Sequence, residues 1–207
     1  MSKKIRVGNQ TVFYSPFEPF HYAIKNCFDA FEWFPDRPYG QGWDVGQVGM
    51  ATRRYIKETA LMKGMGLSVH AMLPGNPLSA GDMKGIYRDM EFAKEIGASV
   101  FNIHLYRDGP LEAYAKAVLP LIGVLEEAGI RLSIENTSLT SPEDFNGLFD
   151  ILKSEGEVGM CFDLGHANLF GPTRNNYLEY VERLNAPIIH LHLHENWGHE
   201  DSHLTVF

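Results

Sequence analysis

The residues best suited to chemistry in this chain are histidines and acids that end short apolar segments. His70, His104, Glu135 and Asp163 stand at or beside the ends of four such segments, and His192 lies on another. Any one of them alone is more often a hydrogen-bonded core residue or a cap, but five at equivalent places need a common reason, because charged or imidazole groups are costly inside a buried strand. Carboxylates and imidazoles gathered without cysteine are ligands for Zn²⁺, Mn²⁺, Co²⁺ or another divalent ion. The pattern therefore predicts a metal site.

Two short motifs accompany these segments. Asp163 and His166 form an Asp-x-x-His pair, and Asp201 and His203 form an Asp-x-His pair. The second pair follows His190-Leu191-His192-Leu193-His194-Glu195, in which the histidines alternate and so share one face of a strand. Each motif alone is a weak signal, but their order along the chain, after Ile134-Glu135-Asn136-Thr137, is specific.

Short segments rich in β-branched and aromatic residues alternate with stretches of helical length, and the repeat of about thirty residues is that of one βα unit. Serine, proline and two acids at 141–144 predict a helix start, and Gly97 and Gly129 predict helix ends. The predicted strands are Ile5–Gly8, Ala30–Phe34, Leu67–Met72, Val100–Leu105, Arg131–Asn136, Gly159–Leu164 and Ile188–His194. Six helices lie between them, among them Val48–Lys63, Ala80–Ile96, Leu111–Ala128 and Tyr177–Leu184.

This alternation predicts an α/β fold with parallel strands, either an open doubly wound sheet or a (β/α)₈ TIM barrel. The glycine-rich phosphate loop that follows the first strand of a dinucleotide-binding sheet is absent from the sequence. The polar residues at the strand ends favour the barrel, because its strands converge on a C-terminal mouth where active sites lie. No linker or low-complexity segment interrupts residues 1–207, so we expect a single domain.

Composition limits the kind of partner. The 207 residues are 44% hydrophobic and carry a net charge of −8, which excludes attraction of nucleic acid or an anionic membrane by bulk charge. No run approaches the roughly 18 apolar residues of a membrane span, and no apolar region follows the first lysines, so we expect a cytoplasmic protein. Cys27 and Cys161 lie in apolar runs without metal-ligand spacing and are predicted to be buried thiols.

These residues and motifs resemble the xylose isomerase-like TIM-barrel superfamily, which includes sugar (phosphate) isomerases and epimerases and the endonuclease IV class. The resemblance runs from the first strand to Leu204. It implies that Glu135, Asp163 and His192 hold a central divalent metal. In the endonuclease IV pattern, His70 and His104 would bind a further metal bridged by Glu135, and the third metal would be bound by His166, Asp201 and His203.

The chain departs from this family at its C-terminal end. The family's fourth central ligand is a glutamate on the eighth strand, whereas the sequence ends at Phe207, before a further helix and strand. We therefore expect a barrel truncated after the seventh strand. An open edge of that kind would favour aggregation unless another subunit covered it, so a homo-oligomer is one alternative.

The resemblance favours a metal-dependent sugar or sugar phosphate isomerase or epimerase that removes a proton next to a carbonyl. Glu135 would be the acid/base catalyst, and the cofactor would be Mn, Zn, Co or Mg, with no nucleotide. For Glu32, an ion pair with a lysine or arginine of the barrel is an equally open interpretation, whereas tryptophans in such loops more often serve only in packing. The predicted substrate-binding residues are Glu32, Trp33, Asn136, His194 and Trp197.

Two alternatives remain. The full ligand set fits a phosphodiesterase of the endonuclease IV type acting at abasic sites in DNA, the only hypothesis with a nucleic-acid partner. Against it, the basic group Arg53, Arg54 and Lys57 resembles a solvated helix face, and the loop 71–74 lacks the tyrosine expected of a DNA-inserting loop. The second alternative is a barrel that no longer catalyses a reaction.

Overall fold

The computed structural model describes residues 5–11, 15–36, 42–153 and 157–204. The chain divides into two compact units. Unit 1 comprises Met1–Gly75, Ser79–Phe101 and Ala128–Ile130. Unit 2 comprises Asn76–Leu78, Asn102–Glu127 and Arg131–Phe207.

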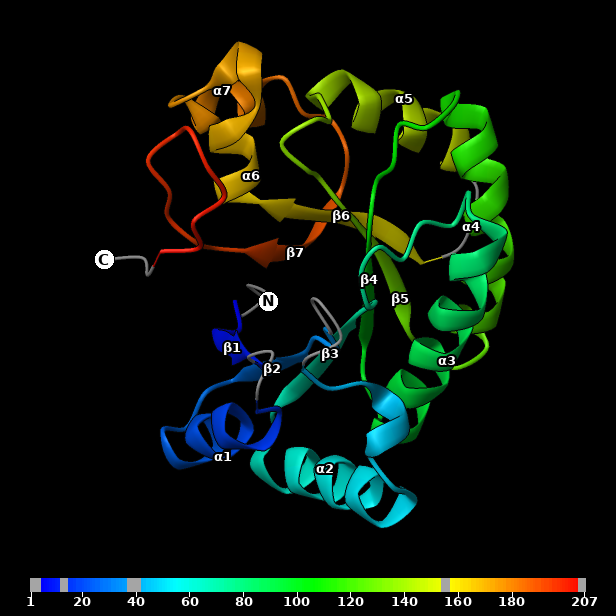
Figure 1. The fold of residues 1–207 in the computed structure, drawn as a ribbon, viewed down its shortest axis with the longest axis vertical. Coiled ribbons are helices and arrows are strands. Elements are labelled where there is room, and N and C mark those ends of the chain that lie inside the picture. Colours follow the sequence, from blue (N-terminus) through cyan, green and yellow to red (C-terminus); the bar gives the residue numbers. More distant parts are fainter. Residues whose placement is uncertain (1–4, 12–14, 37–41, 154–156, 205–207) are drawn as a thin grey trace. The chain divides into compact units, whose positions relative to one another are not determined.

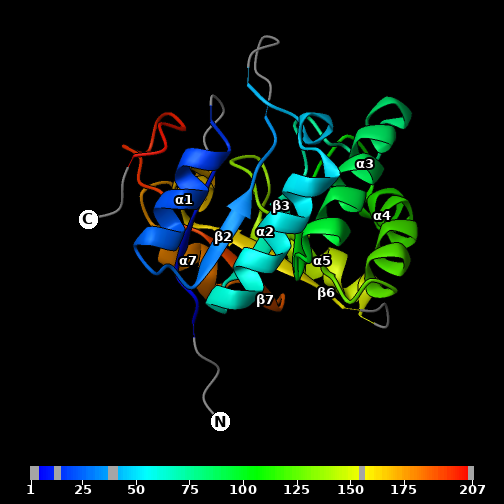
Figure 2. The ribbon, with the colours of Figure 1, turned by 90° about the horizontal axis from the view of Figure 1, so that it is seen from below.

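Unit 1 consists of parallel strands and the helices that pack on them (Figure 2). Its core is aromatic. Trp33 is fully buried, with its ring centroid 5.1 Å from those of Phe20 and Phe31. Helix α1 packs on the first two strands, α3 packs on the third, and α2 packs on α3. The elements are β1 (Gly8–Gln10), α1 (Phe17–Lys25), β2 (Ala30–Trp33), the 3-10 helix η2 (Val45–Gln47), α2 (Met50–Lys63), β3 (Gly66–His70) and α3 (Ala80–Ile96).

Strand β4 (Val100–His104) begins in unit 1 and ends in unit 2, where the remaining strands and helices follow. Helix α4 packs on β5 and α5, and α6 packs on β6, β7 and α7. These elements are α4 (Leu111–Glu126), β5 (Arg131–Glu135), α5 (Pro142–Leu152), β6 (Val158–Asp163), α6 (Leu164–Leu169), the 3-10 helix η3 (Gly171–Thr173), α7 (Tyr177–Glu182) and β7 (Ile188–His192).

The seven strands follow the order of the chain, β1-β2-β3-β4-β5-β6-β7 (Figure 1). The predicted α/β architecture of parallel strands joined by helices is confirmed, and so are the strands that carry the polar ends. The helix start at Ser141 is also confirmed, since its Oγ accepts the N–H of Asp144 while the Asp144 carboxylate accepts the N–H of Ser141. The sequence pattern gives no bounds for α1 or α6.

The first strand lies three residues later than predicted. Ile5 and Val7 are 76% and 61% exposed, so the apolar run that suggested Ile5–Gly8 is not buried as a strand. Pairing instead starts at Gly8, opposite Ala30. A Cβ at Gly8 would lie 2.3 Å from the Ala30 carbonyl oxygen, so a larger residue would push β1 away from β2.

Two further predictions need correction. Cys27 is exposed, because it follows the end of α1 in a left-handed conformation, whereas Cys161 is buried as predicted. The basic group on α2 is not wholly a solvated face. The Arg53 guanidinium is paired with Glu95 and lies 5.2 Å from the Phe92 ring, which leaves Arg54 and Lys57 as its exposed members. None of the helices in the described ranges is long and apolar enough to cross a membrane.

Helix α3 carries a buried acid that fixes the segment after β3. The Oδ2 atom of Asp89 accepts the Met72 N–H at 2.9 Å, and the residue is 1% exposed. Burial raises the pKa of Asp89 to about 6, and the Met72 N–H and Arg88 only partly offset this. The folded chain therefore binds this proton more tightly than the unfolded chain, and stability falls as the pH rises from about 4 to about 6.

We expect Asp89→Asn to stabilise the chain at pH 7, because asparagine keeps the acceptor for Met72 and removes the buried charge. The gain should be of the order of 2 kcal/mol above pH 6 and should vanish near pH 4, where the native carboxyl is neutral. Urea unfolding of both proteins across this range measures it. Asp150→Asn, at an exposed position of α5, is the matched control and should show no such pH-dependent gain. Parallel stability curves for wild type and Asp89→Asn would contradict the prediction.

Candidate metal centre

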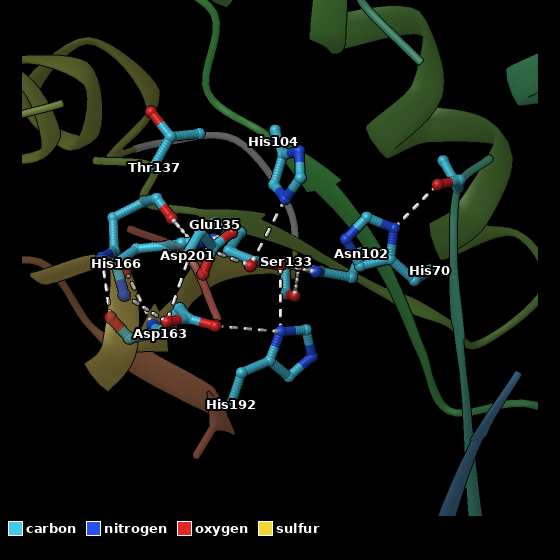
Figure 3. A network of polar contacts seen from close by, with 12 residues as sticks. His70, Asn102, His104, Ser133, Glu135, Thr137, Asp163, His166, His192 and Asp201 are labelled. Atoms are coloured by element: carbon cyan, nitrogen blue, oxygen red, sulfur yellow. Dashed lines mark hydrogen bonds and ion pairs between the residues drawn. The ribbon is translucent and has the colours of Figure 1, made fainter. Parts of the chain in front are cut away.

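Three strands of unit 2 end in the residues of the central group, which we define as Glu135, Asp163 and His192 (Figure 3). Parallel strands bring their carboxyl ends to one edge, and the register places Asp163 opposite His192. The His192 Nδ1 atom lies 3.1 Å from Glu135 Oε2 and 3.8 Å from Asp163 Oδ2. One ligand atom from each residue lies within 4.8 Å of the others, so the three can share one ion.

The Glu135 carboxylate is buried, at 2% exposure. Its Oε2 accepts from the Asn102 amide, and Asn102 Oδ1 in turn accepts from Ser133 Oγ at 2.5 Å. On its other oxygen, Oε1, the His104 Nε2 atom lies 3.3 Å away. Burial by itself would raise the pKa of Glu135, but His192 and His104 outweigh it and hold the pKa well below its usual value. The residue is therefore a carboxylate, as a metal ligand must be.

The separations in the central group fit a cation better than a set of direct ion pairs. A hydrogen bond between an imidazolium and a carboxylate is about 2.7–2.9 Å long. The His192 Nδ1 atom instead lies 3.1 Å from Glu135 Oε2 and 3.8 Å from Asp163 Oδ2. Donors about 2.1 Å from the centre of a tetrahedron are about 3.4 Å apart. The donor set and its spacing therefore suit a divalent ion.

A second cluster, the peripheral group, consists of His166, His194, Asp201 and His203, whose ligand atoms also lie within 4.8 Å of one another. It adjoins the central group through Asp163, which caps α6 by accepting the His166 N–H at 2.6 Å. The His166 Nδ1 atom lies 2.8 Å from the Asn136 carbonyl oxygen. Because a carbonyl only accepts, Nδ1 carries the hydrogen and Nε2 is left to face Asp201 at 3.3 Å.

Opposite charges dominate the peripheral group. Burial would raise the pKa of Asp201, but hydrogen bonds from His166 and His203 hold it far below its usual value. Burial would lower the pKa of His166, yet Asp201 and Glu135 raise it to about 11. Asp201 also raises the pKa of His203. Without a cation, the His166 imidazole is protonated at neutral pH and faces Asp201 in the space that a cation would take.

Asn136 links the two strands that carry the carboxylates. Its Nδ2 donates to the Asp163 carbonyl oxygen at 2.9 Å, and its Oδ1 accepts the Asp163 N–H at 2.8 Å. Both ends of this buried amide thus hold the end of β6 against the end of β5. The geometry places Asn136 as a support for the ligands, and its predicted contact with substrate stays a prediction.

Unit 1 holds three of the predicted site residues. His70 ends β3, and its Nδ1 lies 2.7 Å from the Ala71 carbonyl oxygen, a contact that fixes the direction of the ring. Glu32 is buried and accepts from Ser68 Oγ at 2.8 Å, while Trp33 belongs to the aromatic core. The metal shared by His70, His104 and Glu135 stays a prediction. In unit 2, Trp197 is 71% exposed.

Three residues that shape these groups are absent from the predicted site. Asn102 and Ser133 orient the Glu135 carboxylate, and the sequence carries a signal for both, since each lies two residues before a strand-end ligand. The third is Gly165, which gives no signal of its own. A Cβ at Gly165 would lie 2.0 Å from His194 Cε1, so the His194 ring occupies the space of the missing side chain.

Solved structures with this fold include proteins named as an epimerase and as an endonuclease. The chain is similar to the TTHB071 protein from Thermus thermophilus soaked with ZnCl2, with a TM-score of 0.73, 19% identity and coverage of 98% of this chain and 82% of that one. For a D-psicose 3-epimerase in the presence of D-fructose, the TM-score is 0.71 at 14% identity, covering 92% and 73%. For endonuclease IV from Thermus thermophilus it is 0.60 at 18% identity, covering 86% and 71%. At these identities the likeness establishes the fold alone.

Sequence comparison agrees with the fold. The chain is 34% identical over 97 residues to the uncharacterized protein MJ1311 of Methanocaldococcus jannaschii, a match covering 42% of this chain and 31% of that protein. The chain thus matches only about a third of this curated relative's length. The model of the xylose isomerase-like TIM barrel family matches residues 20–206, which carry every residue of the central and peripheral groups. The chain therefore belongs to the xylose isomerase-like TIM barrel family.

Proposed function

We propose that the chain is a divalent-metal-dependent isomerase or epimerase of a sugar or sugar phosphate, acting by proton transfer at the carbon next to a carbonyl. The observation that carries this proposal is the convergence of two buried carboxylates and one imidazole at the ends of β5, β6 and β7. Three protein ligands leave positions on a cation open, and a substrate's carbonyl and adjacent hydroxyl oxygens can take them.

Glu135 and the residues around it have distinct parts in this proposal. The bound cation would polarise the substrate carbonyl and lower the pKa of the neighbouring C–H. Glu135 is ionised and can accept that proton, while Asn102 fixes the orientation of its carboxylate. His104 Nε2, 3.3 Å from Glu135 Oε1, is placed to exchange a proton with it. The Tyr114 hydroxyl donates to the His104 carbonyl at 2.6 Å and steadies the end of β4.

Among the predicted substrate-binding residues, Trp197 is the most exposed, and its ring can pack on the face of a sugar. Trp33 has no such face, since it packs among Phe20, Phe31 and Trp43. Glu32 and His70 remain proposed ligands of substrate and metal, respectively. A D-psicose 3-epimerase among proteins of this fold supports the choice of a sugar.

We expect Glu135→Gln to lower the affinity of the chain for Mn²⁺ or Co²⁺ at the central group by at least about tenfold, because the amide removes the shared anionic ligand. Isothermal titration calorimetry on metal-free protein measures this. Glu157→Gln is the matched control, because Glu157 is exposed and outside both groups. Equal affinities in the two variants would contradict the assignment of Glu135 as a ligand.

We also expect the metal-loaded chain to exchange the C–H proton next to the carbonyl of a ketose or ketose phosphate with solvent. NMR in D₂O detects the deuterium, and Glu135→Gln should abolish its incorporation while Glu157→Gln retains it. The assay does not require the final product to be known. Exchange that persists in Glu135→Gln would rule out this residue as the base, and no exchange on any ketose of a panel would overturn the proposal.

A phosphodiesterase is the second candidate, and the peripheral group is the observation that favours it. Its residues include His166, Asp201 and His203, the set that the endonuclease IV pattern assigns to a third metal. An endonuclease IV is among the proteins of this fold. Cleavage of a duplex with one abasic site, together with no deuterium incorporation into sugars, would select this function.

A further inference from the structure

We propose that His194 completes a closed four-ligand zinc site with His166, Asp201 and His203, and that this site fastens the segment 195–204 onto α6 without taking part in a reaction. The resemblance to the endonuclease IV pattern implies three ligands here, His166, Asp201 and His203, whereas His194 is among the residues predicted to bind substrate. The proposal is independent of which reaction the central group catalyses.

The first support is the spacing around Asp201. The Nε2 atoms of His203 and His166 lie 3.2 and 3.3 Å from Asp201 Oδ2, and Nε2 of His194 lies 3.7 Å from Oδ1. These values bracket the edge of about 3.4 Å expected between donors that surround one zinc ion. They are longer than the roughly 2.7–2.9 Å of a charge-assisted hydrogen bond.

The second support is the state of the His194 ring. The residue is 7% exposed, and neither ring nitrogen makes a hydrogen bond to any group in the described part of the chain. The contact of Nε2 with Asp163 Oδ1 is 3.1 Å long but does not have hydrogen-bond geometry. Buried polar groups are almost always hydrogen-bonded, and an ion is one of the few explanations for an exception. A cation at Nε2 supplies the absent interaction.

The third support is that the structure makes room for this ring. Gly165 takes the position at which any side chain would collide with His194, so the ring enters against the backbone of α6. There it stacks on His203, with ring centroids 4.0 Å apart and planes 5° apart. Nε2 of both rings lies beside the same Asp201 carboxylate. Because the lone pair of an imidazole nitrogen lies in the plane of its ring, one of the two parallel rings must turn for both Nε2 atoms to bind one ion.

The site has an evident structural task. Between Glu195 and Leu204 the chain forms one antiparallel bridge, and Asn196 ties the segment to α6 through the Gly165 carbonyl at 2.8 Å and the Asn168 amide at 3.0 Å. Asp201 and His203 have side chains that are 44% and 53% exposed. His203 also has a φ of 45°, which a residue with a side chain seldom adopts without a compensating interaction.

Four protein donors, three nitrogens and one oxygen, distinguish this site from the central group. Structural zinc sites are closed by four protein ligands, whereas catalytic zinc keeps one position for water or substrate. His194 is therefore the residue that turns a three-ligand, open site into a closed one. We infer that zinc here contributes to the stability of the C-terminal segment.

The test uses wild type, His194→Asn and His199→Asn. His199 lies in the same segment and is exposed, with Nδ1 3.0 Å from the Trp197 carbonyl oxygen, so its variant is the matched control. Titration with Co²⁺ reports coordination, because four-coordinate cobalt absorbs visible light strongly and six-coordinate cobalt weakly. We expect strong bands for wild type and His199→Asn, and weak bands together with at least about tenfold weaker zinc binding for His194→Asn. Unchanged bands and affinity in His194→Asn would overturn the proposal.

The absorption spectrum of bound cobalt also distinguishes this site from a third cluster of possible ligands. Cys161, His190 and His192 have ligand atoms within 4.8 Å of one another, and cobalt bound there would show a thiolate charge-transfer band in the near ultraviolet. We expect the strong visible bands without that thiolate band. Thiolate absorption that grows in step with the visible bands would assign the tetrahedral cobalt to the cysteine group and overturn the proposal.

A further measurement needs no variant. Trp197 is a 71% exposed chymotrypsin site within the segment that the zinc would fasten. Added zinc should slow cleavage after Trp197 in the wild-type chain at least tenfold, as mass spectrometry of the fragments would show. Cleavage that zinc leaves unchanged would overturn the structural role even if His194→Asn failed to fold.

Discussion

The arrangement of unit 2 depends on the burial of one carboxylate. An ionised acid removed from water is stable only where other charges and hydrogen bonds replace its hydration. Glu135 has three imidazoles within 3.4 Å and the Asn102 amide as its substitutes for water. These partners come from β4, β7 and α6, so the elements that converge on this edge are those that compensate the charge. A divalent ion would meet the same demand more fully, because it would bring two positive charges to the carboxylate.

Asp163 and Asn136 connect the central group to the peripheral group. Asn136 holds the backbone of Asp163 at both its N–H and its carbonyl, and Asp163 then caps the helix that carries His166. One oxygen of Asp163 faces His192 and the other faces His194. The two clusters thus share a carboxylate and a helix start, and a displacement of β6 would disturb both. This shared support explains why a short helix of six residues can position a ligand accurately.

The residues of the central group could be predicted from the sequence because the pattern that marks them is local. A histidine or acid at the end of an apolar strand is visible without a structure, since burial on both faces makes it costly there, and Glu135, Asp163 and His192 were found in this way. Other features depend on packing between distant residues. Nothing in the sequence around Gly165 reveals that the His194 ring enters its space from 29 positions away along the chain. The exposure of Cys27 and the pairing of Arg53 with Glu95 likewise follow from how α1 and α2 pack, not from the residues beside them.

The coordination that each group offers bears on the choice between reactions. A phosphodiester cleaved by three metals needs open positions for water or phosphate at the ions that act on it. If four protein donors close the peripheral site, the ion there has no position to offer, and its effect on substrate is confined to its charge. The open positions then belong to the central group, where Glu135, Asp163 and His192 supply three ligands. A single open cation beside an ionised glutamate is the arrangement suited to proton transfer next to a carbonyl, which is why we place the isomerase before the phosphodiesterase.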